Sequence, residues 1–191
     1  PYSMMNSTFY PVNGGNSVKI SSSSQEWCGH TYMELLNKEQ YEISLNSYFE
    51  GESFENLKIT KDVLEDDLWS MIRLHPKELP IGNLKVIPSF FYLRLMHKET
   101  KSYDAVVEKA SNANNTIYTI TYPELNRSLS ITFENSFPNK IKAWKEIYPD
   151  GFGDKKEVLT TTGTLLETVK TDYWKKNKTI DLIWREKLEL D

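Results

Sequence analysis

The chain has 191 residues, with 23 basic and 27 acidic side chains and a formal net charge of −4. Its mean hydropathy is −0.55, and it holds no apolar run near the roughly 20 residues that a membrane-spanning helix needs. Aromatic residues make up 13% of the chain, which excludes a disordered protein. The acidic balance excludes a nucleic-acid binder that relies on phosphate neutralisation. We expect a single domain over residues 1–191, because domains cluster near ~100–150 residues.

Polar and apolar residues alternate in the N-terminal part of the chain with the period of two that is typical of β-strands. A short strand is predicted over residues 18–22, a long strand over 25–36, and a third over 41–49. The polar residues 37–40 have the length of a hairpin loop. The second and third strands are therefore predicted to form a hairpin.

The period changes to that of a helix over residues 60–74. Thr60 is a candidate N-cap, and Pro76 is expected to stop the helix. The apolar stripe of this helix consists of Val63, Leu64, Leu68, Met71 and Ile72. This stripe predicts that one face of the helix packs on the sheet.

The C-terminal part again has the pattern of strands. The predicted strands are 84–96, interrupted by Pro88, then 103–108, 116–122, 127–134, 141–147 and 157–170. A polar turn at 123–126 makes a hairpin of its two neighbours. Residues 180–188 are predicted to form a short helix.

These elements sum to roughly eight or nine strands and one or two helices, and short loops favour antiparallel neighbours. The predicted fold is α+β and mostly β. It is a curved antiparallel sheet, a half-barrel-like meander, with one main helix packed on it.

The strand predicted over 25–36 would align four reactive side chains on one face, because side chains alternate along a strand. These are Glu26, Cys28, His30 and Tyr32. Such a set can bind a metal ion or a ligand, or transfer protons. Residues two apart on a strand are roughly 6–7 Å apart, which leaves room for a ligand between them.

Arg73 and His97 are candidates to complete such a site. A structural interpretation is also open, in which the row is half-buried and faces a second layer. Cys28, the only cysteine, is then a buried and unreactive thiol, as free cysteines often are. The sequence assigns no catalytic residue, metal or cofactor.

Several segments spread over nearly the whole chain carry a resemblance to a known family. They are residues 1–9, 25–30, 47–52, 65–69, 122–133 and 172–174. They resemble a family of Bacteroidota cell-envelope proteins, mostly lipoproteins, that often carry the label septum formation inhibitor Maf. The Ser/Arg-rich phosphate-binding motif of true Maf proteins has no counterpart, since the serines at 21–24 precede Gln25 and Glu26 with no arginine nearby.

The resemblance implies a bacterial envelope location, in the periplasm or at the outer membrane. It also implies an upstream portion with a signal peptide and a lipidated cysteine, so the chain is expected to be the C-terminal part of a longer exported protein. Membrane association would then run only through that upstream lipid anchor.

The expected function is that of a non-catalytic cell-envelope lipoprotein that binds a lipid, another apolar ligand or a protein partner on its curved sheet. One alternative is an enzyme or metal-binding protein that uses the face of Glu26, Cys28, His30 and Tyr32. A second alternative is an accessory subunit of an outer-membrane protein assembly.

Overall fold

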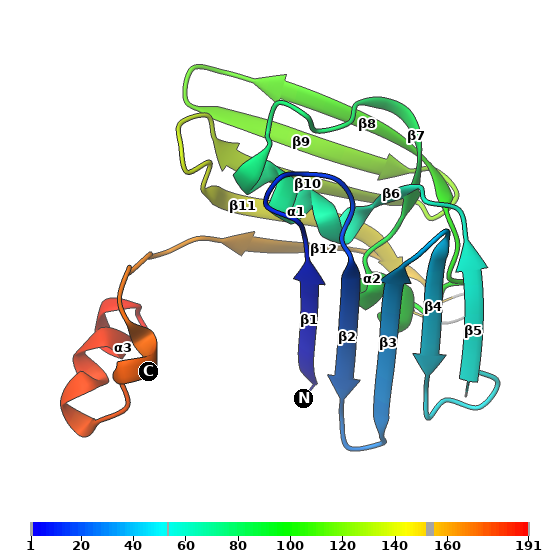
Figure 1. Ribbon diagram of the computed structural model, residues 1–191, viewed down its shortest axis with the longest axis horizontal. Coiled ribbons are helices and arrows are strands. Elements are labelled where there is room, and N and C mark those ends of the chain that lie inside the picture. The colour runs from blue at the N-terminus through cyan, green and yellow to red at the C-terminus, as the bar shows by residue number, and fades with distance from the viewer. Residues whose placement is uncertain (1, 53, 152–154, 191) are drawn as a thin grey trace.

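A computed structural model describes residues 2–52, 54–151 and 155–190, and its strands form two sheets (Figure 1). The first sheet is an antiparallel meander of β1 (Ser3–Phe9), β2 (Lys19–Gln25), β3 (His30–Asn37), β4 (Tyr41–Asn46) and β5 (Phe54–Ile59), in that order. The predicted hairpin around residues 37–40 is confirmed, because Asn37 pairs with Tyr41.

The second sheet has seven strands. In chain order these are β6 (Val63–Leu64), β7 (Gly82–Ile87), β8 (Tyr103–Ser111), β9 (Asn115–Tyr122), β10 (Arg127–Glu134), β11 (Ile141–Asp150) and β12 (Glu157–Thr164). Each strand lies beside its neighbour in sequence, and all pairs are antiparallel except β6 with β7. The predicted β9–β10 hairpin is confirmed, because Tyr122 pairs with Arg127 across the loop. The α+β, mostly β class is confirmed as well, and its strands are divided between two open sheets.

Two helices, α1 (Glu65–Leu74) and α2 (Phe90–Leu95), lie where the two sheets meet (Figure 1). Leu68 and Ile72 of α1 and Phe90 of α2 have no exposed surface. They join one apolar core with the inward side chains of both sheets, such as Ile43 and Ile120. The predicted apolar face of α1 is therefore buried between two layers rather than on one sheet.

The long strand predicted over 25–36 is wrong, because the chain reverses inside it. β2 ends at Gln25 and β3 begins at His30, and the Glu26 N–H donates to the Gly29 carbonyl at 3.0 Å. A Cβ atom at Gly29 would lie 2.4 Å from Cγ of Tyr48, so glycine lets that ring cover the turn. Trp27, in this turn, is 92% exposed.

Several other predicted boundaries differ from the structure. The helix begins at Glu65 and not at Thr60, because residues 63–64 pair with β7 as β6. The strand predicted over 84–96 ends at Ile87, just before Pro88, and residues 90–95 form α2. β1 and β5 were not predicted, and the sequence of β1 lacks a regular alternation of polar and apolar residues.

The C-terminal segment, residues 165–190, leaves the sheets after β12 (Figure 1). It holds two 3-10 turns, η1 (Tyr173–Lys175) and η2 (Thr179–Leu182), and the short helix α3 (Ile183–Lys187). The predicted short helix over 180–188 is thus confirmed, whereas the strand predicted over 157–170 ends at Thr164. Among the described residues, no helix is long and apolar enough to cross a membrane.

Candidate functional site

The residues predicted to share a strand face lie in different settings. Glu26 is in the β2–β3 turn and accepts a hydrogen bond from the Tyr48 hydroxyl. Cys28 is in the same turn and is exposed, so the expectation of a buried thiol is wrong. The reversal of the chain at this turn separates both side chains from the strand on which they were placed.

His30 and Tyr32 do lie on β3, and neither contributes to a larger reactive cluster. His30 is exposed, and the Tyr32 hydroxyl donates to Glu34 at 2.9 Å. Arg73, in the last turn of α1, donates through Nε to the Pro138 carbonyl at 2.9 Å. In the described ranges no three potential metal ligands of the His, Cys, Asp and Glu types come together.

One part of the predicted convergence is present. Glu26 and His97 line the same small hollow, of about 30 Å³, beside Tyr48 and Arg94. His97 contacts Glu52 through Nδ1 at 3.1 Å. A hollow of this size holds a water molecule rather than a substrate.

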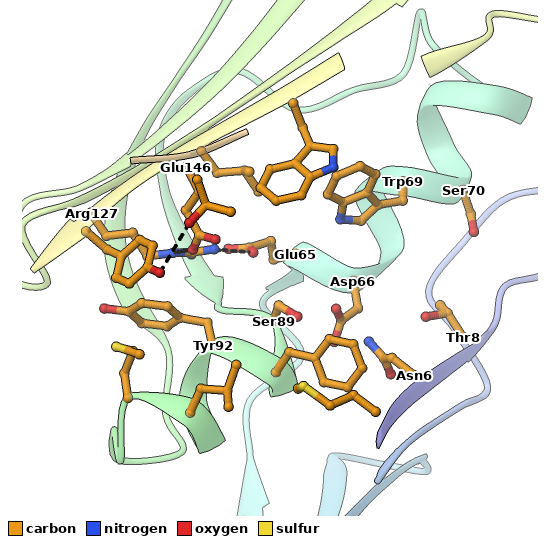
Figure 2. Close-up of a pocket in the computed structure, with 18 residues that line it drawn as sticks. Asn6, Thr8, Glu65, Asp66, Trp69, Ser70, Ser89, Tyr92, Arg127 and Glu146 are labelled. Carbon is orange, nitrogen blue, oxygen red and sulfur yellow. Dashed lines mark hydrogen bonds and ion pairs between the residues drawn. The ribbon is translucent and has the colours of Figure 1, made fainter. Parts of the chain in front are cut away.

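A much larger pocket, of about 540 Å³, lies between the two sheets (Figure 2). It is bounded by β1 of the first sheet, by α1 and α2, and by β10, β11 and β12 of the second sheet. Its apolar walls include Met4, Trp69, Phe91, Leu95, Leu129 and Trp144. A concave apolar site with a few polar groups is the usual form of a small-molecule site, which spans roughly 300–1,000 Å³.

A buried ion-pair network forms one side of this pocket (Figure 2). Arg127 at the start of β10 donates two hydrogen bonds to Glu65, at 2.5 and 2.7 Å. Its Nε donates to Glu146 at 2.5 Å, and its Cζ lies over the Tyr92 ring, 4.1 Å from the ring centroid. The Arg127 and Glu65 side chains are only 2% and 1% exposed. A bidentate pair of this kind is held in one geometry.

The carboxylates of the network favour the charge on Arg127. Burial opposes this charge, but Glu65 and Glu146 together outweigh burial and raise the pKa of the guanidinium. The Tyr122 hydroxyl donates to Glu65 at 2.6 Å. Burial, reinforced by the charge of Glu65, raises the pKa of Tyr122 well above its ordinary value, so this phenol stays a donor.

Asp66 lies beside this network, in the first turn of α1, and is 6% exposed. Its Oδ2 accepts a hydrogen bond from the Phe90 N–H at 3.2 Å, and Ser89 also donates to it. Burial raises the pKa of Asp66 to about 7, and the charges of Glu65 and Asp67 add to this effect. A pocket carboxyl that titrates near neutral pH can hold or release a proton, or bind a donor group.

Two further polar atoms of the pocket residues are buried and have no hydrogen-bond partner in the part of the chain that the structure describes. They are Oδ1 of Asn6, from β1, and the hydroxyl of Tyr92, from α2. Asn6 and Asp66 point to the same space in Figure 2. Because a buried polar atom without a partner is costly, these positions favour a bound polar group.

The position of Trp144 in the pocket wall depends on a glycine of the neighbouring strand. Trp144 on β11 pairs with Gly163 on β12. A Cβ atom at Gly163 would lie 2.2 Å from Nε1 of Trp144. The missing side chain therefore lets the indole ring lie across β12 at the edge of the pocket.

Local sequence patterns do not reveal this pocket. Glu65, Asp66 and Asp67 are of the type that favours the start of a helix, yet the structure buries all three. Three adjacent acids beside an apolar stripe were the available signal, but the partner Arg127 is 62 positions away from Glu65. Comparisons of the chain with protein-family models, curated proteins and solved structures gave no match.

Proposed function

We propose that this protein is a non-catalytic cell-envelope binding protein that holds an apolar small ligand in the pocket between its two sheets. The observation that carries the proposal is the pocket of about 540 Å³, with Trp69, Phe91 and Trp144 in its walls. Such walls favour an apolar body by removing its surface from water. The ordered polar groups on one side favour a ligand with one polar end.

The proposed location is the bacterial envelope, in the periplasm or at the outer membrane, with an upstream lipid anchor. The resemblance of segments such as 25–30 and 122–133 to envelope lipoproteins supports it. A ligand pocket suits that location, because apolar molecules need a carrier across an aqueous compartment.

The test is titration with N-phenyl-1-naphthylamine, an apolar dye that fluoresces when it leaves water. We expect saturable binding to the wild-type protein. Thr161→Trp places a large ring at the pocket edge and should weaken binding about tenfold or more, which corresponds to ~1.4 kcal/mol. Thr161 lines the pocket from the exposed strand β12, so this substitution spares the core.

Thr162→Trp is the matched control, because adjacent residues of a strand point to opposite faces. It should leave dye binding unchanged. Absence of binding to the wild-type protein, or an equal loss in both variants, would contradict the proposed function.

A second candidate function is an accessory subunit of an outer-membrane assembly. It is favoured by the C-terminal segment, where Tyr173, Trp174 and Ile180 are 76%, 67% and 83% exposed. Removal of residues 165–191 should then abolish co-purification of a partner protein from the native envelope and leave dye binding intact. Retention of the same partner by the shortened chain would contradict this candidate.

A further inference from the structure

Four charged side chains line the pocket, and the structure gives three of them a partner of opposite charge. Arg127 directs Nε at Glu146 and its two terminal nitrogens at Glu65. Its faces are covered by aromatic rings, Tyr92 at 4.1 Å and Tyr122 at 5.1 Å. An anionic group of a ligand would therefore find this cation already engaged.

Asp66 is the remaining charged group, and its partners are neutral. It accepts hydrogen bonds from the Phe90 N–H and from Ser89. The charged groups around it are Glu65 and Asp67 on its own helix, and Arg127 and Glu146 across the pocket. Because its hydrogen-bond partners are neutral, the negative charge of ionised Asp66 is costly to bury. A cation bound beside the carboxylate would offset that cost.

The pocket offers a second acceptor near Asp66. Oδ1 of Asn6 has no hydrogen-bond partner among the described residues, and the Asn6 side chain lies beside Asp66 in Figure 2. A donor group with two or three N–H bonds matches a carboxylate and an amide oxygen together. The rings of Trp69 and Phe91 border this space as well, and aromatic faces attract cations.

We propose that the pocket selects a protonated amine carried on an apolar body, with the ammonium group donating to Asp66 and the body against Trp69 and Trp144. This inference rests on the proposed ligand-binding function and names the chemical class of its ligand. A carboxylate or phosphate end is disfavoured, because Glu65, Asp66 and Glu146 all border the pocket.

The experiment measures displacement of N-phenyl-1-naphthylamine from the wild-type protein by decylamine, decanol and decanoate, each below its micelle concentration. The three ligands share one chain length and differ in their polar end. At pH 8 the Asp66 carboxyl, with its pKa of about 7, is mostly ionised. We expect decylamine to bind at least about tenfold more tightly than decanol, because hydrogen bonds between charged groups are stronger than those of a neutral hydroxyl. Decanoate should bind most weakly.

Asp66→Asn tests whether the preference for decylamine depends on the charge of this side chain. The asparagine keeps an acceptor for the Phe90 N–H and removes the negative charge. It should abolish the preference, so that decylamine binds no more tightly than decanol. Asp67→Asn is the matched control on the same helical turn, because Asp67 accepts from the Ser17 N–H and is not part of the pocket wall. It should keep the preference.

The possible results distinguish failure of this inference from failure of the proposed function. Decanol or decanoate binding as tightly as decylamine to the wild-type protein overturns the inference and leaves the proposed function standing. A preference for decylamine that survives Asp66→Asn also overturns it. Dye binding that no ligand of the series displaces overturns the inference too, whereas failure of the dye itself to bind overturns the proposed function.

Discussion

The substitution Asp66→Asn should remove a pH-dependent loss of stability that the wild-type protein carries. Burial raises the pKa of Asp66 from 3.8 to about 7, so the folded protein holds its proton more tightly than the unfolded chain does. A shift of roughly three pKa units corresponds to ~4 kcal/mol. This is an upper limit for the cost of ionising Asp66 in the folded state.

The sign follows from proton linkage. Between pH 3.8 and about 7 the folded state binds more protons than the unfolded state, so this carboxyl makes the free energy of unfolding fall as pH rises. Above that window its contribution is constant. The difference in stability between Asp66→Asn and the wild-type protein should therefore be small near pH 4 and should grow to a few kcal/mol in favour of the variant near pH 8, on the order of the ~4 kcal/mol limit.

The assay is urea unfolding followed by tryptophan fluorescence at a series of pH values, with linear extrapolation to water. Asp104→Asn is the control, because the Asp104 side chain is 80% exposed and pairs with Lys85 at the surface. Its difference from the wild-type protein should stay nearly flat over the same range. A flat difference for Asp66→Asn as well would refute the claim that this carboxyl is buried and protonated near neutral pH.

Two further substitutions and one thiol-labelling reaction test the rest of the structure. Arg127→Met leaves the buried Glu65 carboxylate without its cation and should lower the free energy of unfolding by about 3–5 kcal/mol, measured by urea unfolding; a loss near zero would show that the pair is open to water. Gly163→Ala adds a methyl group where the Trp144 indole lies, so it should shift tryptophan emission and weaken dye binding, and unchanged spectra and affinity would contradict the described packing. Cys28 is exposed, so a thiol reagent such as dithionitrobenzoate should label it without denaturant, whereas labelling only after unfolding would place it in the core.

The β9–β10 hairpin and the helix α1 were predictable because the sequence patterns that indicate them lie within a few neighbouring residues. The β9–β10 hairpin was predicted because two alternating runs flank a polar turn, and Tyr122 indeed pairs with Arg127. The α1 stripe was predicted because Leu68 and Ile72 recur at helical spacing, and both are fully buried. Such patterns need only neighbouring residues to be read.

The candidate site was not predictable in the same way, because it is assembled from distant segments. Asn6, Asp66 and Trp144 meet in one pocket, and no local pattern links β1, α1 and β11. The predicted site on one strand face, from Glu26 to Tyr32, did follow a local pattern, but that prediction required an unbroken strand. The turn that breaks this strand depends on Tyr48 packing over Gly29, which is itself a long-range contact.

The β12 strand gives the pocket a wall that is independent of the core. Among the described strands, β12 pairs with β11 alone, and its residues are exposed along its whole length apart from the partly covered Gly163. Thr161 of this strand nevertheless borders the pocket. Local opening of an edge strand costs far less than global unfolding. Under the proposed function, exchange of the ligand and unfolding of the domain would therefore be governed by separate free energies, and substitutions in β12 would change the first with little cost to the second.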